Sequence, residues 1–390
     1  MKNWKPGLLT RLAIAIVLGI VAGLFLPACG IRALNSFRDL FGQFIKYLVP
    51  FIILGFVTPA IADTGRAAGR MLLLTMGLAW GSTIFAGTFA YVASCTVDPW
   101  LLRGANLANA TQALSFPAYF SLRIPPILDV VTALVTAFML GLGIAALKAD
   151  ELYLAFGQLK AIVARTIAKA FVPLLPVYIF TVITDLTASG RLKVIAGPAV
   201  KLMVFCTLLT VVVLFAQYAL AGLVSRKNPL RALVNMLPAY LTGWGCCSSA
   251  ATIPVTLRQT KLNGVSEETA NLVIPLCSNV HLAGSMSNMV AYAAGLMVMW
   301  GEPLAPTAFA EFIFMMSIIA VASPGVPGGC VLAAATLVET ALGFTPERYA
   351  LMVAIYLALD GMGTACNLTG DGAIALVVDR LRHSPHRHSH

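Results

Sequence analysis

Charged residues are scarce in this chain for its length. Only 11% of its 390 residues are Asp, Glu, Lys or Arg, whereas soluble domains carry about 25%. So few charged side chains cannot cover the surface of a water-soluble protein of this size. Hydrophobic residues make up 59% of the chain, and the mean hydropathy is +0.87. The composition therefore excludes an ordinary soluble domain.

The sequence also lacks the ligand spacings of a metal or redox site. It has eight cysteines but no CxxC pair and no Cys/His spacing of the kind that binds zinc. We interpret the cysteines as small packing residues. Cys29 lies in FLPACG, which weakly resembles a lipoprotein cleavage site. Because further apolar runs follow, we favour an uncleaved first helix over the lipoprotein alternative.

What the sequence has instead is a series of long apolar runs. They lie at about 8–28, 40–62, 71–95, 155–185, 195–224 and 348–379. A helix needs about 20 apolar residues to cross a bilayer. The segment 107–147 is interrupted by prolines, which predicts a kinked crossing or one made of several pieces. The runs predict an all-α polytopic protein of the cell inner (plasma) membrane.

The net charge of +10 does not indicate a nucleic-acid partner, because the basic residues lie between the apolar runs. In multi-pass proteins such residues concentrate on the cytoplasmic side. They are Lys2, Lys5, Arg11, Arg66, Arg70, Arg226, Lys227, Arg231, Arg380, Arg382 and Arg387. Placing them on one side predicts that both termini are cytoplasmic and that the number of full crossings is even.

Two apolar segments in the second half are split by small residues and proline. Residues 229–260 contain GWGCCSSAATIP, and residues 306–343 contain ASPGVPGG. Each arm is too short to cross a bilayer, and a long apolar run follows each segment, at 268–299 and 348–379. Paired interrupted segments indicate an inverted repeat around a transport site. We expect re-entrant hairpins, because unpaired backbone cannot face lipid; the alternative is four short helices joined by plain loops.

The last apolar run carries a polar stripe, although charge at bilayer depth is costly. Asp360, Thr364, Asn367 and Asp371 are spaced by four, three and four residues, so they share one helix face. Apart from Arg348 at its start, the last apolar run has no basic residue before Arg380. The two acids therefore need a cation from elsewhere: a protein base, an ion, a proton or a ligand ammonium group.

A histidine stands in the middle of the preceding run, at 268–299. His281 lies in SNVHLAGSMSN, among serines and asparagines. A buried histidine is commonly a neutral hydrogen-bonding residue, but imidazole also titrates near neutral pH and can carry a proton. Both interpretations remain open at the level of sequence.

These motifs resemble the dicarboxylate/amino acid:cation symporters, which include the excitatory amino acid transporters and their archaeal homologues. The resemblance covers essentially the whole chain and is most specific in SSAATIPVTLR, GVPGG and NLTGD. It implies a homotrimer with an elevator mechanism, in which each subunit has eight transmembrane helices and two re-entrant hairpins that form inverted repeats. The implied parts are a scaffold at 1–70 and 96–192, a transport part at 71–95 and 193–382 with hairpins at about 229–260 and 306–343, and a cytoplasmic tail at 383–390.

The resemblance also implies a substrate site and an ion site. The implied substrate contacts are Ser248, Ser249, Ser285, Gly325, Val326, Pro327, Asp360, Thr364 and Asn367. Among them, Asp360 matches the aspartate that binds a substrate amino group. Asn367 and Asp371 match a sodium site. Ser82 and Thr83 match a hydroxyl pair that helps to bind another sodium ion, and His281 stands at a residue of that same site.

Several positions depart from the family pattern. Gly363 and Cys247 stand where acidic-substrate members have an arginine in one or the other position. A second substrate carboxylate would then stay unpaired in a dry site, which is costly. The family motif asparagine-methionine-aspartate-glycine-threonine reads HLAGS here, so Ala283 replaces a sodium-binding carboxylate. The second hairpin tip is also shorter, which leaves the site at Asp371 as the most intact.

Together the residues predict a secondary active transporter for a small neutral amino acid or related amine-bearing solute. Transport would be driven by protons or by sodium ions, with fewer sodium ions bound than in relatives, and would need no organic cofactor. The partners of the protein would be the solute, membrane lipid and further copies of the chain. The alternatives are a symporter for dicarboxylates or acidic amino acids, a solute-gated channel and a non-cycling receptor. The doubled hairpin unit favours alternating access. An enzyme is not expected, because no nucleophile elbow or HExxH motif occurs.

Overall fold

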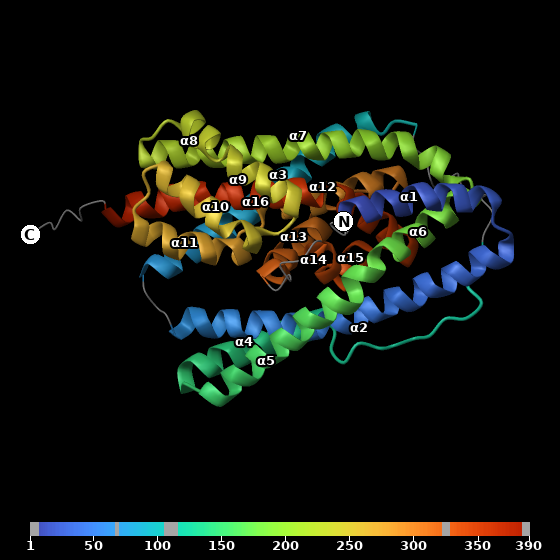
Figure 1. Cartoon of the computed structure of the whole chain (residues 1–390), viewed down its shortest axis with the longest axis horizontal. Helices are drawn as coiled ribbons and strands as arrows, with labels where there is room; N and C mark the ends of the chain where they lie inside the picture. Colours follow the sequence, from blue (N-terminus) through green and yellow to red (C-terminus); the bar gives the residue numbers. More distant parts are fainter. Residues whose placement is uncertain (1–7, 67–69, 105–115, 322–327, 384–390) are drawn as a thin grey trace, which may run out of the picture.

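The computed structural model describes residues 8–66, 70–104, 116–321 and 328–383, and every regular element within these ranges is a helix. The helices form an elongated bundle (Figure 1). The described residues include six helical segments that are long and apolar enough to cross a bilayer. They are Ala28–Asp63, Met71–Leu101, Asp150–Ala188, Arg191–Ser225, Glu267–Met299 and Pro346–Arg382. The prediction of an all-helical, multi-pass membrane protein is therefore confirmed.

One group of helices packs around the long helix α2. The group consists of α1 (Leu8–Phe25), α2 (Ala28–Arg66), α4 (Val130–Leu147), α5 (Asp150–Thr166), the π-helical turn η2 (Ile167–Phe171) and α6 (Val172–Ala188). Helix α2 contacts α4, α5 and α6, and α1 lies along α6. Figure 1 shows α2, α4 and α5 along one side of the bundle, opposite α7 (Arg191–Ser225).

The kinked crossing predicted at 107–147 is only partly correct. Residues 116–129 form no helix, and α4 begins at Val130; residues 105–115 lie outside the described ranges. The side chain of Asp129 accepts a hydrogen bond from the backbone N–H of Thr132 at 2.9 Å. This bond satisfies one of the free N–H groups at the start of the helix. Asp129 therefore acts as a helix cap, which fixes where α4 starts.

A second group packs around α12 (Ala283–Met299). Helix α12 contacts α3 (Arg70–Leu101), α7 and α16 (Pro346–His383), and every residue from Ala283 to Met297 is buried. A Cβ atom on Gly284 would lie 2.6 Å from the carbonyl oxygen of Gly363 on α16. Glycine is needed at this contact because any side chain would force α12 and α16 apart.

Each of the two split segments folds as three helices. The first contains α8 (Pro229–Asn235), α9 (Leu237–Cys246) and α10 (Ser249–Leu262), and the second contains α13 (Pro306–Val321), α14 (Gly329–Ala333) and α15 (Ala335–Leu342). Helix α9 packs against α10, and α13 packs against α15. Between α9 and α10 the chain reverses at Cys247, whose φ of 51° is left-handed, and at Ser248, whose side chain caps α10. The α13–α15 segment contacts α2 and so connects the two groups of helices.

The apolar run at 268–299 is not one continuous helix. It consists of α11 (Glu267–Val280) and α12, separated at His281 and Leu282. His281 has the extended angles φ −95° and ψ 102°. The break leaves the N–H groups at the start of α12 without intrahelical partners. Polar side chains from α3 and α16 supply those partners, and this arrangement brings the candidate site together.

Candidate functional site

A small cavity lies where α10, the α11–α12 break, α14 and α16 meet. Its volume is about 40 Å³, and its walls include six of the residues that the sequence predicted as substrate contacts. These six are Ser248, Ser249, Ser285, Asp360, Thr364 and Asn367. The other three, Gly325, Val326 and Pro327, lie outside the described residues. Residues more than 100 positions apart in sequence thus converge on one cavity.

Asp360 connects the cavity to the second split segment. The residue is 6% exposed, and its Oδ2 accepts a hydrogen bond from the N–H of Gly328 at 2.8 Å. Gly328 has a φ of +76°, which a residue with a side chain adopts only with strain. Within the described part of the chain, Asp360 forms no ion pair with a lysine, arginine or histidine. A buried carboxylate of this kind is stable only if a cation or a proton neutralises its charge.

Asn367 connects α16 to the start of α12. Its Oδ1 accepts hydrogen bonds from the N–H groups of Gly284 and Ser285, at 2.8 and 3.1 Å. Its Nδ2 donates to the Ser285 hydroxyl at 2.9 Å. On the α3 side, the Thr83 hydroxyl accepts a hydrogen bond from the N–H of Leu282 at 3.2 Å. Both side chains therefore satisfy backbone groups that the helix break leaves free.

His281 is fully buried and lies at the centre of a second polar cluster. Its Nδ1 is 2.9 Å from Oδ1 of Asp371 and 3.2 Å from the carbonyl oxygen of Asn367. Since both of these atoms are acceptors, Nδ1 carries a hydrogen. Its Nε2 is 3.1 Å from the Ser82 hydroxyl and 3.2 Å from Nε2 of Gln217. Gln217 also donates to Ser82 at 2.9 Å, so three helices converge on one imidazole.

The polar cluster is tightly packed but leaves two polar atoms free. Oδ2 of Asp371 and Oε1 of Gln217 are buried and have no hydrogen-bond partner among the described residues. A Cβ atom on Gly370 would lie 2.5 Å from Oε1 of Gln217 and 2.6 Å from Cε1 of His281. Only glycine at this position allows Gln217 and His281 to approach α16. Carboxylate and amide oxygens without a hydrogen-bond partner are the type of ligand that a hard cation such as sodium prefers.

Sequence reasoning missed Gln217. It lies within the apolar run at 195–224, on α7. A polar amide inside a membrane-spanning run is itself a signal of function. Its neighbour Tyr218 donates a hydrogen bond to the carbonyl oxygen of Thr369 at 2.8 Å, which holds α7 against α16.

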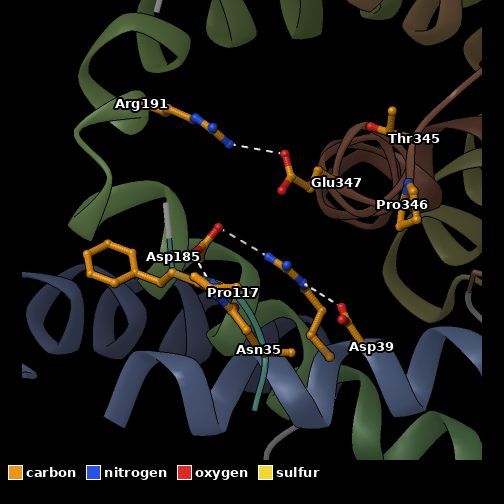
Figure 2. A pocket seen from close by; sticks show the side chains of 11 residues that line it. Asn35, Asp39, Pro117, Asp185, Arg191, Thr345, Pro346 and Glu347 are labelled. Carbon is orange, nitrogen blue, oxygen red and sulfur yellow. Dashed lines mark hydrogen bonds and ion pairs between the residues drawn. The ribbon is translucent and has the colours of Figure 1, made fainter. Parts of the chain in front are cut away.

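A larger polar cavity lies between α2, the end of α6 and the beginnings of α7 and α16 (Figure 2). Its volume is about 510 Å³. On one wall Arg38 binds Asp185 at 3.2 Å, and on the other Arg191 binds Glu347 at 3.1 Å. Further along α2, Lys46 forms an ion pair with Glu339 of α15. Of these ion pairs, the one between Lys46 and Glu339 joins the two groups of helices, which also share a continuous hydrophobic core.

Comparison with known proteins agrees with this arrangement. The sequence pattern of the family described as "Sodium:dicarboxylate symporter family" matches residues 8–381. A serine/threonine transporter SstT from Acinetobacter baumannii is 26% identical over 398 residues, covering 96% of this chain and 97% of the relative. Its namesake from Streptococcus thermophilus is 24% identical over 396 residues, covering 97% of each chain. The resemblance drawn from the motifs is confirmed. This chain belongs to the sodium:dicarboxylate symporter family, whose members are cation-coupled transporters and not enzymes.

Proposed function

We propose that this protein is a secondary active symporter for a small neutral amino acid or related amine-bearing solute. The observation that carries this proposal is the buried carboxylate of Asp360, which lines the small cavity and has no protein cation as a partner among the described residues. A solute ammonium group would supply the missing positive charge. The names of the two relatives, serine/threonine transporters, support a substrate of this class.

The solute carboxylate would bind at the other side of the cavity, near the start of α10. Ser248 caps this helix of 14 residues, and Ser249 is its first residue. The free N–H groups and the helix dipole favour an anion there. Asp360 would thus bind the ammonium group of a zwitterion, and the start of α10 would bind its carboxylate. A simple amine or a simple acid would interact with only one of these two groups.

No lysine, arginine or histidine is among the described residues that line the cavity, so an acidic side chain would find no opposite charge there. Cys247 and Gly363 occupy the positions where acidic-substrate members of the family have an arginine. Space beside Gly363 is also limited, because a Cβ atom there would lie 3.1 Å from Nδ2 of Asn288. An unpaired second carboxylate in this buried site costs several kcal/mol. We therefore propose a neutral substrate over a dicarboxylate.

We further propose that the cation acts at the polar cluster of His281, Asp371, Ser82 and Gln217. Sodium or a proton, or both, would serve as the coupling ion. The free oxygens of Asp371 and Gln217 support this assignment, and the family includes sodium in its name. The polar cluster is joined to the substrate cavity through Asn367, whose side chain lines the cavity and whose carbonyl oxygen contacts His281.

The two groups of helices suggest how the solute would cross. In our proposal α1, α2 and α4–α6 form a scaffold that trimerises, and the remaining helices form a transport part that moves as an elevator. Because α3 continues to Leu101, we place the boundary after that residue and not at 95. The α8–α10 and α13–α15 segments would be re-entrant hairpins within eight full crossings, with both termini and the tail at 383–390 in the cytoplasm.

A thermal-shift screen of the purified protein tests the substrate assignment, because a bound ligand stabilises the folded state by mass action. We expect serine, threonine and alanine to raise the melting temperature, and aspartate, glutamate and succinate to leave it unchanged. The screen is repeated with sodium, with potassium and at two pH values. Stabilisation by the acidic solutes alone would contradict the proposal and favour a dicarboxylate symporter.

A further inference from the structure

A groove of about 330 Å³ lies between α3, α7 and α16. All three helices belong to segments that are long and apolar enough to cross a bilayer. Nine of the eleven described residues that line the groove are glycine or apolar. Among them, Phe85 and Leu220 are 45% and 56% exposed. The groove therefore opens on the outer surface of the protein, where a membrane protein meets lipid.

Two glycines on α3 leave the space that forms the groove. Gly77 and Gly81 lie one helical turn apart, and a Cβ atom on either of them would meet no neighbouring atom within 4 Å. They differ in this respect from Gly370, where a side chain would clash. Close helix packing therefore does not require these two glycines, although glycine weakens a helix interior relative to alanine. What the absent side chains provide is room at the protein surface.

The size and polarity of the groove restrict what can fill it. A bound water molecule needs about two to four polar partners, which a wall of mostly apolar residues does not offer. A helix is about 10–12 Å across, so a single turn occupies about 400–600 Å³, which is more than the whole groove holds. The groove has room for about ten groups of the size of a water molecule, and methylene groups are of that size. It thus fits one flexible hydrocarbon chain.

Positive charge lies at one end of the groove. Val377 of α16 lines the groove, and Arg380 follows it one turn later on the same helix face. Arg380 is exposed and forms no ion pair with a described acidic residue; its neighbour Asp379 instead accepts a hydrogen bond from Ser266 at 2.6 Å. Arg226, which ends α7, is likewise exposed. Figure 1 shows the C-terminal end of α16 and α8, which follows Arg226, at the same end of the bundle.

We propose that the groove is a binding site for an anionic phospholipid, with one acyl chain between α3, α7 and α16 and the phosphate group at Arg380 and Arg226. Basic residues at the ends of membrane-spanning helices bind anionic headgroups in this way. The inference does not depend on the proposed solute. The two polar residues of the groove, Ser82 and Gln217, belong to the polar cluster around His281. The acyl chain covers this side of the polar cluster and keeps water away from it.

Native mass spectrometry of the purified full-length protein measures this site directly. The protein is titrated with dioleoyl phosphatidylglycerol and with dioleoyl phosphatidylcholine, which have the same acyl chains and differ in headgroup charge. We expect the original chain to bind the anionic lipid at least about fivefold more tightly, since one arginine near the membrane surface provides this factor. Arg380→Gln should lower the affinity for phosphatidylglycerol about fivefold and leave the affinity for phosphatidylcholine unchanged.

Filling the groove tests the binding of the acyl chain. Gly81→Leu places a side chain in the groove and should weaken binding of both lipids more than about tenfold, because displacing two methylene groups already has this effect. Gly77→Leu, one turn earlier, should do the same. The controls are Gly197→Leu, at another exposed glycine with no neighbouring atom within 4 Å, and Arg165→Gln, at an exposed arginine of α5. Neither control should change the affinity for either lipid.

Four outcomes would overturn the inference. Equal affinities for the two lipids in the original chain would exclude a site for an anionic headgroup. Unchanged lipid affinities in both leucine variants of α3 would exclude the groove as the position of the acyl chain. A smaller oligomer in the spectra of these two variants, with lipid binding unchanged, would show that a second copy of the chain occupies the groove. Equal losses of affinity in the control variants would show that the lipids bind without a defined site.

Discussion

The charge of Asp360 should decide whether an amine-bearing solute binds, and Asp360→Asn removes only that charge. Asparagine keeps an oxygen that can accept the hydrogen bond which Gly328 now donates to Oδ2 at 2.8 Å. The variant should therefore fold and keep α14 in contact with α16. Removing one partner of a buried charge pair costs about 3–5 kcal/mol, which is a loss of affinity of more than about a hundredfold.

The assay is calorimetric titration of serine into the original chain and into two variants. Asp360→Asn should bind serine too weakly to measure, with a melting temperature close to that of the original chain. Asp360→Ala should also lose the hydrogen bond from Gly328 and leave a buried N–H unpaired, which costs about 1–3 kcal/mol. It should melt at a lower temperature than Asp360→Asn. Serine binding by Asp360→Asn within a few-fold of the original chain would refute the assignment of the ammonium site.

Three further predictions concern other parts of the site. Gly363→Arg should make aspartate raise the melting temperature of the protein, since arginine supplies a bidentate donor for a carboxylate. Adding Asn288→Ala, which removes the close contact with Asn288, should increase this stabilisation by aspartate. No stabilisation by aspartate would show that position 363 does not determine substrate selectivity. Gly370→Ala should lower the melting temperature, because its Cβ atom would lie within 2.6 Å of two side chains. Gly197→Ala is the control, since no atom lies within 4 Å of its Cβ position, and it should leave the melting temperature unchanged. Equal changes in melting temperature would argue against the close packing of Gln217 and His281 on Gly370. Asp371→Asn should abolish the dependence of uptake on an ion gradient while serine still binds, as measured in vesicles and by titration; persistent ion-driven uptake would place the coupling site elsewhere.

The sequence predicted the helical architecture well because membranes impose simple rules. Apolar runs of about 20 residues must form helices with internal hydrogen bonds, so the six long segments could be located directly. The helical period of 3.6 residues also placed Asp360 and Thr364 on one face of α16, and the structure shows both at the same cavity. Small residues and proline indicated where α9 and α10 would separate.

Other features depend on contacts between helices and have no local signal. The break at His281 and Leu282 is stable because Asn367 and Thr83, far away in sequence, satisfy the free N–H groups. Hydropathy alone predicted a continuous helix there. The position of Gln217 against His281 likewise depends on how α7 packs on α16. The cavity in Figure 2 arises from the contact between two groups of helices, which no single helix encodes.

The central claim is that the protein moves a neutral amino acid against its concentration gradient at the expense of an ion gradient. The most direct measurement is accumulation of labelled serine in proteoliposomes, with an inward sodium gradient, an inward proton gradient or neither. We expect serine inside to exceed the outside concentration when at least one ion gradient is present, and Asp360→Asn to show no uptake. Serine that only equilibrates under both gradients would contradict the account and indicate a channel, whereas accumulation of aspartate but not serine would refute the proposed substrate class.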